Sequence, residues 1–400
     1  MKKKRFKPAV LLILLFALPL LLLWGILFRG QLDRSDTENR TLARFPAFSV
    51  SAFLDGSFQD GLEDALGDQL LFSEQVKSGV QDGRNALTSL QKSLLYALQP
   101  SLSGGYSPIA EGYNHYRNEE NRIVETPRDY LDCQEHLNRL AEAFRNHPGI
   151  PLYLYFIENS RVVDFDHPDR PDEPLSRIVE AFRPDGWDVF HVADYEDYKA
   201  KFYQTDHHWN AAGSYLGYQA VSRLLHPDLP EEALYKPVKT VELPVVFQGS
   251  YARQTHVLCA DEPFTVSFFD LPAHRVTIQG KKGTYGHLSL YERGKVPTDP
   301  LRNHYAYCYG GDYGLLEYDF RQPDQGNLLL VASSYSNPIN ALIASGYDHT
   351  FVVDLRYWES WAGSPFDPAA FCTEHNIGTI LLLGDAGFFF TDEAEKGAEE

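Results

Sequence analysis

Short apolar runs rich in β-branched and aromatic residues recur along the chain from residue 151 onward and predict the strands of a buried parallel sheet. Segments with helical periodicity separate most of these runs, as at Pro174–Phe182 and Ala211–Leu225. Strands that alternate with helices favour an α/β fold with a three-layer α/β/α sheet. The predicted strands are Pro151–Ile157, Trp187–Val192, Asn327–Ala332, His349–Leu355 and Thr379–Leu383.

The remaining pattern divides the chain into further segments. Residues 31–125 hold a helical segment, about Ser51–Leu98, followed by a linker, and the main domain is expected over residues 126–390, opening with a helix at Asp129–Asn146. Between about residues 226 and 325, Gly and Pro punctuate short strands such as Thr240–Phe247 and Phe264–Phe269, which predicts a β-rich insertion. Residues 391–400 form an acidic tail.

The N-terminus has the pattern of a membrane anchor. Residues Pro8–Phe28 carry no charge and follow a cluster of basic residues at Lys2–Arg5 and Lys7. A helix of this length spans about 30 Å, the thickness of the hydrocarbon core. A cleaved signal peptide is the alternative, but no small-x-small cleavage site follows the run. We therefore expect residues 1–30 to be a cytoplasmic flank and a transmembrane helix, with the rest of the chain outside the cytoplasm.

The charge and composition of the chain limit the classes of molecule that it can bind. The net charge is −19 although basic residues crowd the N-terminus, so the body of the protein should repel nucleic acid and anionic surfaces. Aromatic residues make up 14% of the chain, which suits either stacking on sugar rings or core packing. The four cysteines show no C-x-x-C spacing; a disulfide between Cys259 and Cys308 and buried free thiols are both compatible with the sequence.

The densest group of reactive side chains is Asp206-His207-His208-Trp209, directly before the helix at Ala211, for which Asn210 is a suitable N-cap. An Asp two residues before a His can hold its Nδ1 proton and leave Nε2 as a base, although a structural loop would also account for such a pair. A metal site is disfavoured, because adjacent histidines point apart and no further ligands stand nearby at the usual spacing. No cofactor is expected.

A second candidate lies at the end of the predicted strand Asn327–Ala332. The sequence Ser333-Ser334-Tyr335-Ser336-Asn337-Pro338 follows it, a strand–turn–helix pattern that would place a serine hydroxyl at the carboxyl edge of the sheet. Backbone N–H groups of such a turn can stabilise an oxyanion. Alone the signal is weak, because most serines after strands are caps.

Together these features resemble the DHHW family, which is similar to the alginate O-acetyltransferase proteins of the SGNH hydrolase-like superfamily. Its strongest motif here is Asp206–Trp209, and further similarities lie at Glu38–Leu42 with Phe45-Pro46, at Phe247–Tyr251 and at Asp354–Tyr357. The resemblance covers most of residues 35–385. Where relatives have Gly-Asp-Ser or Gly-Thr-Ser, this chain has Ala332-Ser333-Ser334, while Leu383–Ala386 imitates the Gly-Asp-Ser box without its serine.

The resemblance implies a catalytic triad: Ser334 as nucleophile, His208 as base and Asp206 as the group that orients the base. Further residues are expected at the oxyanion or substrate: Gly249 as a second N–H donor, Tyr335 and Trp209 for stacking on a sugar, Arg356 for an anionic group and Asn337 in the turn. Core packing of Trp209 and pairing of Arg356 with Asp354 are the alternatives.

The implied function is O-acetyl transfer to a cell-envelope or exported polysaccharide, with a multispanning membrane O-acyltransferase as the acetyl source. A carbohydrate acetyl esterase and a non-catalytic polysaccharide-binding or assembly protein of the envelope are the alternatives, the last favoured by the altered turn.

Overall fold

The computed structural model describes residues 31, 42–49, 52, 57–69, 107–108, 115–117, 122–125, 130, 133–145, 149–163, 173–255, 262–293 and 302–391. The chain divides into two compact units, residues 1–98 and 99–400. The predicted anchor Pro8–Phe28 and tail residues 392–400 lie outside the described residues. No helix within the described ranges has the length and apolar character needed to cross a membrane.

In the first unit, helix α3 (Ser57–Gln69) is the described part of the helical segment expected at residues 51–98. The side chain of Gln69 donates a hydrogen bond to the Ala43 carbonyl at 2.9 Å. Gly61 lies against the ring of Pro46, so the preceding chain packs on one side of this helix.

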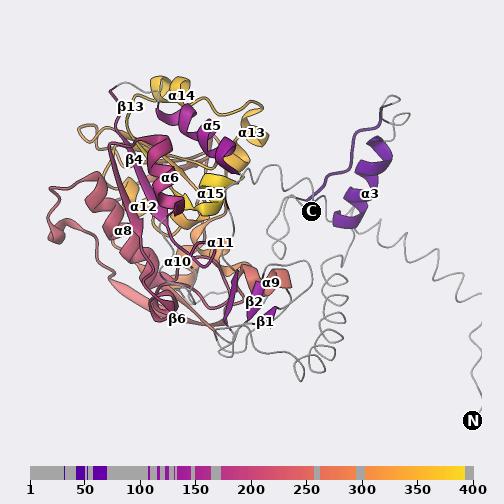
Figure 1. Cartoon of the computed structure of the whole chain (residues 1–400), viewed down its shortest axis with the longest axis horizontal. Helices are drawn as coiled ribbons and strands as arrows, with labels where there is room; N and C mark the ends of the chain where they lie inside the picture. The colour runs from indigo at the N-terminus through magenta and orange to yellow at the C-terminus, as the bar shows by residue number, and fades with distance from the viewer. Residues whose placement is uncertain are drawn as a thin grey trace, which may run out of the picture. The chain divides into compact units, whose positions relative to one another are not determined.

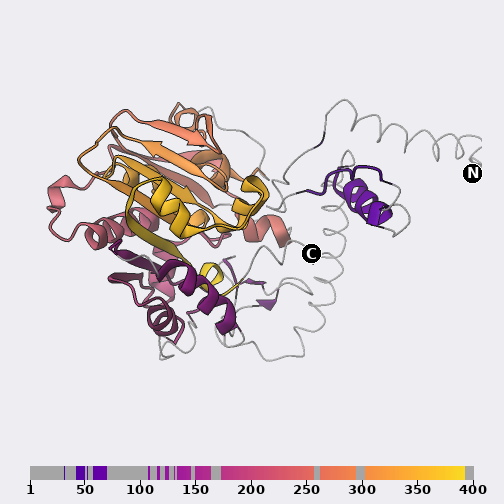
Figure 2. The same ribbon diagram turned by 90° about the horizontal axis from the view of Figure 1, so that it is seen from above.

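The second unit is built on an eight-stranded sheet of order β5-β4-β13-β11-β12-β10-β8-β9. Its first five strands are parallel, and the last three are antiparallel to their neighbours. The five parallel strands are those that the apolar runs predict. Figure 2 shows the sheet passing from the purple strands at one edge to the orange strands at the other. The strands are β4 (Leu152–Ile157), β5 (Gly186–Phe190), β8 (Arg275–Ile278), β9 (Lys281–Lys282), β10 (Leu316–Asp319), β11 (Asn327–Ala332), β12 (His349–Val353) and β13 (Ile377–Asp385).

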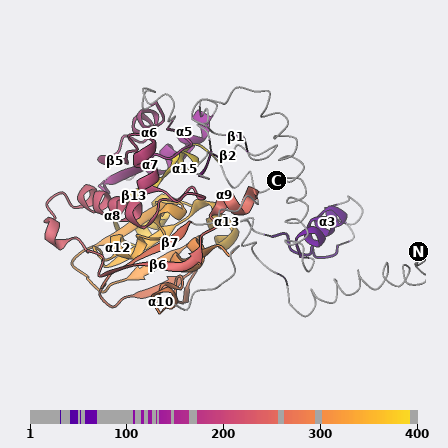
Figure 3. The ribbon, with the colours of Figure 1, turned by 90° about the horizontal axis from the view of Figure 1, so that it is seen from below.

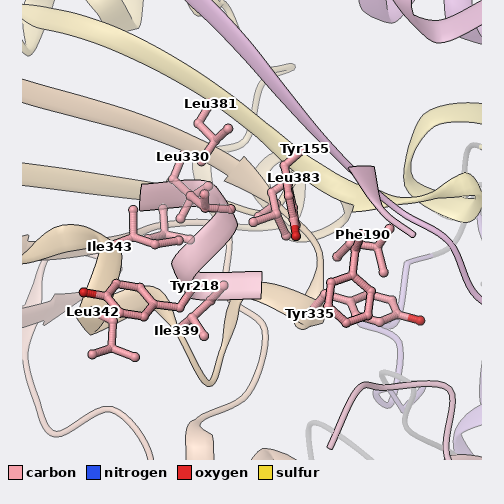
Figure 4. Close-up of a cluster of buried hydrophobic side chains, with 14 of the residues drawn as sticks. Tyr155, Phe190, Tyr218, Leu330, Tyr335, Ile339, Leu342, Ile343, Leu381 and Leu383 are labelled. Carbon is pink, nitrogen blue, oxygen red and sulfur yellow. The ribbon is translucent and has the colours of Figure 1, made fainter. Parts of the chain in front are cut away.

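Successive side chains of each parallel strand point to opposite faces of the sheet. Each face therefore packs against its own layer of helices. On one face, Leu154, Leu329 and Leu382 pack with α5 (Gln134–Arg145), α6 (Glu173–Phe182), α14 (Pro368–Glu374) and α15 (Ala386–Phe390), which lie together in Figure 1. On the other face, Tyr155, Leu330 and Leu383 pack with α8 (Ala211–Leu225) and α12 (Asn340–Ala344). Figure 4 shows this second cluster, with Tyr335 at its end beside Phe190.

The segment at residues 226–325 is divided between two places. Strands β8, β9 and β10 join the main sheet, whereas β6 (Lys239–Val246) and β7 (Pro263–Phe268) form a separate antiparallel pair. Side chains of this pair form a small aromatic core with α10 (Leu288–Glu292) and α11 (His304–Tyr309). Figure 3 shows β6, β7 and α10 gathered on one side of the sheet. A short helix η3 (Glu231–Ala233) precedes β6.

A three-stranded sheet, β1 (Ser107–Pro108), β2 (His115–Arg117) and β3 (Ile123–Glu125), lies ahead of α5. Arg122, beside β3, donates a 2.8 Å hydrogen bond to the Tyr203 carbonyl. The N–H of Ile123 donates to the Gln204 carbonyl at 2.9 Å. The small sheet is therefore fixed to the loop that carries the Asp206–Trp209 motif.

Candidate active site

The Asp206–Trp209 motif lies on a closed loop between α7 (Tyr195–Lys201) and α8. Phe202 and Trp209 form an antiparallel bridge at its base, and the Asn210 N–H donates to the Lys201 carbonyl at 2.8 Å. The Asn210 side chain accepts hydrogen bonds from the N–H groups of Ala212 and Gly213, as expected for the N-cap of α8. The loop is thereby held at both ends while its tip presents the two histidines.

Asp206, His208 and Ser334 form a continuous chain of hydrogen bonds. The Nδ1 atom of His208 lies 2.6 Å from Oδ1 of Asp206, and its Nε2 lies 2.7 Å from the Ser334 hydroxyl oxygen. The carboxylate can only accept, so it fixes the Nδ1–H tautomer and leaves Nε2 to accept the serine proton. The structure thus brings together the three side chains that the sequence singled out, across 126 residues between His208 and Ser334.

The carboxylate of Asp206 is buried, and both of its oxygens accept hydrogen bonds. Oδ1 also accepts the backbone N–H of His208 at 3.0 Å, and Oδ2 accepts the N–H of Ser250 at 2.6 Å. Burial opposes ionisation of this group, but the nearby imidazole of His208, its hydrogen bond, His207 and Arg253 outweigh burial, and the pKa of Asp206 falls well below its usual range. Asp206 is therefore ionised and oriented toward His208.

Ser334 opens the short 3-10 helix η4 (Ser334–Ser336), which Ser333 alone separates from the end of β11. The first N–H groups of a helix have no partner within the helix, so the Ser334 amide is available to a developing oxyanion. Position 334 stands at the carboxyl end of a central parallel strand, where active sites of open α/β sheets gather. The turn has the predicted strand–turn–helix form, despite Ala332 in place of glycine.

His207 packs against His208 with ring centroids 3.8 Å apart, and its Nδ1 lies 2.8 Å from the Ser250 hydroxyl. Burial and the neighbouring His208 lower the pKa of His207 well below 6.5, further lowered by Arg161 and Arg356 and only partly offset by Asp206. His207 is thus a neutral imidazole beside the His208 base.

A chain of buried polar groups supports the histidine loop from beneath. The Tyr335 hydroxyl donates to the His207 carbonyl at 2.7 Å and accepts from the Asn159 amide at 2.8 Å. The same amide donates to Asp385 at 2.8 Å, and Asp385 pairs with Arg161 at 3.2 Å. Asp385 belongs to the Leu383–Ala386 segment that resembles a Gly-Asp-Ser box without its serine. This segment therefore has a structural role at the end of β13.

The stacking roles expected for Trp209 and Tyr335 are wrong. Trp209 is fully buried and packs against Gly217 of α8, where a Cβ would lie 2.5 Å from its ring. Tyr335 is 1% exposed, and its ring meets Trp209 edge to face at a centroid distance of 5.6 Å. Both rings belong to the core beneath the loop, so neither can stack on a sugar.

The oxyanion role expected for Gly249 is also wrong, because its N–H already donates to the Thr205 hydroxyl at 2.9 Å. Asn337 is likewise engaged: its amide group donates to the Gly310 carbonyl and to Asp312, and its oxygen accepts from Tyr285. Both residues hold the loops around the site rather than facing a reacting group.

Arg356 pairs with Asp354, which was the alternative to binding an anionic group of a substrate. Its Nε and Nη2 atoms bind the two oxygens of Asp354 at 3.0 and 2.7 Å, and Nη2 also lies 3.4 Å from Asp312. Asp354 in turn caps α13 (Leu355–Ala362) by accepting the Arg356 N–H. The guanidinium is therefore committed to two carboxylates of the protein, and the expected anion-binding role is not supported.

Sequence reasoning missed Ser250, Glu262 and Tyr305. Glu262 accepts hydrogen bonds from the N–H groups of Gln204 and Thr205 and from the Thr205 hydroxyl. The Tyr305 ring stacks on His208. Glu262 and Tyr305 lie in none of the motifs noted in the sequence, whereas Ser250 lies within the segment Phe247–Tyr251, where no role was assigned to it.

The expectation that the adjacent histidines point apart is wrong, because the donor atoms of Asp206, His207 and His208 lie within 4.8 Å of one another, a spacing that a metal ion could use. However, both ring nitrogens of His208 are occupied by Asp206 and Ser334. The arrangement suits proton transfer from the serine hydroxyl better than metal ligation. Among the cysteines, Cys308 is a buried free thiol, so it is not paired with Cys259.

Comparison with known proteins identifies similar solved structures. A DHHW family protein from Eubacterium siraeum superposes with a TM-score of 0.51 at 14% identity, covering 72% of this chain and 94% of that one. Bacillus cereus PatB1, solved with a sulfonyl adduct, gives a TM-score of 0.51 at 15% identity, covering 69% of this chain and 96% of that one. The O-acetyltransferase domain of Pseudomonas putida AlgJ gives a TM-score of 0.40 at 8% identity over 71% of this chain and 95% of that one.

No protein-family model matches the sequence, and a search of curated proteins found no match. The similarity to the two structures with a TM-score of 0.51 extends over 94% and 96% of their chains. The chain therefore has the fold of a DHHW family protein, as the Asp206–Trp209 motif predicted.

Proposed function

We propose that this chain is a serine-dependent O-acetyltransferase that modifies a cell-envelope or exported polysaccharide. The observation that carries the proposal is the hydrogen-bonded chain Asp206–His208–Ser334, with the serine at the carboxyl end of a central strand. The motif resemblance and the fold shared with a DHHW family protein support it. The uncharged run Pro8–Phe28 after a basic flank supports a single membrane anchor with the catalytic domain outside the cytoplasm.

The geometry supports a two-step acyl transfer. As the Ser334 oxygen bonds to the carbonyl carbon of an acetyl donor, His208 Nε2 takes the hydroxyl proton and Asp206 stabilises the imidazolium. The Ser334 N–H stabilises the oxyanion. Collapse of this intermediate breaks the bond to the leaving group, which receives the proton from His208, and leaves acetyl-serine.

In the second step a sugar hydroxyl attacks the acetyl-serine while His208 accepts its proton. The second tetrahedral intermediate then expels the Ser334 oxygen, which recovers its proton from His208. The proposed acceptor is a polysaccharide, and a multispanning membrane O-acyltransferase is the proposed acetyl source. Water in place of the sugar would make the same site an acetyl esterase.

A sulfonyl fluoride tests the nucleophile, and the sulfonyl adduct of PatB1 suggests this probe. We expect phenylmethanesulfonyl fluoride to add one sulfonyl group to the full-length protein, measured by intact mass. Labelling should disappear in Ser334→Ala and persist in Ser333→Ala and Ser336→Ala. Absence of labelling in the unmodified protein would favour the non-catalytic binding protein instead.

Acetyl transfer is tested separately with p-nitrophenyl acetate as donor and neutral oligosaccharides as acceptors. Acetylated oligosaccharide, detected by mass spectrometry and dependent on Ser334, supports the transferase. Serine-dependent release of acetate with no acetylated sugar for any acceptor would favour the esterase.

A further inference from the structure

The aromatic ring of Tyr305 lies face to face with the imidazole of His208. The ring centroids are 3.9 Å apart and the ring planes differ by 15°. His207 packs on His208 at a centroid distance of 3.8 Å. Two rings cannot share one face at these separations, so the His208 imidazole lies between His207 and Tyr305.

The same tyrosine also contacts the nucleophile turn. Its hydroxyl donates a hydrogen bond to the backbone carbonyl of Ser334 at 3.1 Å. Burial and the neighbouring groups Tyr309 and Asp206 raise the pKa of Tyr305 well above 10.0, so the hydroxyl keeps its proton and remains a donor. One side chain thus touches both partners of the His208–Ser334 hydrogen bond.

Tyr305 belongs to the segment at residues 226–325, and contacts within this part of the protein fix its side chain. It is 2% exposed on helix α11, whose first turn is capped by the Asn303 side chain accepting the Ala306 N–H. The adjacent His304 is buried, and its Nδ1 lies 2.8 Å from the Tyr291 hydroxyl. Edge contacts with Tyr203 and Tyr309 fix the ring further.

We propose that Tyr305 is a positioning residue for acyl transfer, which stabilises the protonated form of His208 through its ring and orients Ser334 through its hydroxyl. This inference rests on the proposed function. A cation over an aromatic face is attracted by the negative π surface, and the attraction grows where water is excluded. The other face of His208 meets a neutral imidazole, which adds no positive charge to oppose the imidazolium.

The ring and the hydroxyl predict different effects, which two variants separate. Tyr305→Leu removes the ring, so the acidic limb of the pH–rate profile should move to lower pH by roughly half to one unit. Tyr305→Phe keeps the ring and loses only the bond to the Ser334 carbonyl. Its rate should fall by roughly 3- to 10-fold while the midpoint of the acidic limb stays in place.

The measurement is the rate of sulfonylation by phenylmethanesulfonyl fluoride between pH 5 and 9, followed by intact mass on the full-length protein. The matched control is Tyr307→Phe on the same helix, whose ring contacts His287 and Arg302. This control should react as the unmodified protein does. Circular dichroism establishes that each variant is folded.

Each outcome decides the matter. If the unmodified protein reacts and both Tyr305 variants match the Tyr307→Phe control in rate and midpoint, the inference is overturned while the proposed function stands. If the unmodified protein does not react, the proposed function fails, and this inference with it. Should Tyr305→Leu not fold, an unchanged rate in Tyr305→Phe overturns the inference, and a lower rate at the same midpoint supports it.

Discussion

Gly249 lies directly against Asp206: a Cβ at position 249 would stand 2.4 Å from the Asp206 Cβ and 2.3 Å from the Thr205 carbonyl oxygen. The close approach lets the Ser250 N–H reach the Asp206 carboxylate at 2.6 Å. The absence of a side chain at position 249 is therefore part of what orients the triad, although Gly249 touches no reacting atom.

Gly249→Ala should consequently impair both the site and the fold. The clash involves backbone, which cannot turn aside, and we expect a loss of about 1–3 kcal/mol in unfolding free energy together with a fall of at least tenfold in sulfonylation rate. Urea unfolding and the labelling rate measure the two effects. The control is Gly378→Ala, where the nearest atom to a new Cβ is 3.8 Å away. Equal behaviour of the two variants would refute the packing argument.

Asp206→Asn should reduce acyl transfer by roughly 10³–10⁴-fold, because an amide can donate to Nδ1 and so favour the wrong tautomer of His208. Substrate affinity should change little, since the carboxylate is buried away from solvent. The values of kcat and KM for p-nitrophenyl acetate measure this split. Asp324→Asn, at an exposed position, is the control. A loss confined to KM would argue against the orienting role.

Tyr335→Phe should destabilise the protein by about 1–2 kcal/mol, because it leaves the buried His207 carbonyl without the hydroxyl that now donates to it. The activity should fall as well, since this carbonyl belongs to the loop that carries His208. Tyr318→Phe in β10 removes a hydroxyl from another buried tyrosine and should leave activity intact. An unchanged urea midpoint in Tyr335→Phe would contradict the proposed support of the loop.

Glu262 should make stability depend on pH. Burial raises its pKa from 4.5 to about 7, despite hydrogen bonds from Thr205 and Gln204 that lower it. The folded protein therefore binds this proton more tightly than the unfolded chain. The associated stability is fully present below about pH 4.5 and is lost as the pH rises through about 7.

Relative to Glu262→Gln, the unmodified protein should lose on the order of 3 kcal/mol across that interval. Urea unfolding at several pH values between 4 and 8 provides the comparison. Glu242→Gln, exposed on the neighbouring strand β6, should follow the unmodified protein. Parallel curves for the Glu262→Gln variant and the unmodified protein would show that Glu262 does not titrate there.

The apolar runs predicted the parallel strands because a buried strand is a local pattern, whereas the set Ser334, His208 and Asp206 was expected from the resemblance to the DHHW family. The run Asn327–Ala332 is apolar from Leu328 onward, as a strand buried on both faces must be, and its bounds agree with β11. Asp206 and His208 are two residues apart, so a single turn brings them together. The location of the Ser334 hydroxyl at the carboxyl edge of the sheet follows from the position of its strand.

The residues around the triad could not be predicted in this way, since their roles arise from contacts between distant segments. Tyr305 reaches His208 only because α11 packs with β6 and β7 against the sheet. Trp209 looks like a site residue in the sequence, yet Gly217 of α8 makes room for its ring in the core. Strands β8–β10 are short, and nothing in their composition distinguishes joining the main sheet from pairing among themselves.

Strand β13 lies between β4 and β11, although it follows both of them in the sequence. During synthesis, the edges of β4 and β11 that pair with β13 therefore stay unpaired until Ile377–Asp385 has left the ribosome. Exposed strand edges promote association between chains. A chain that stops before Ile377 would lack the centre of its sheet rather than an end, so early termination should yield aggregates instead of a smaller folded protein.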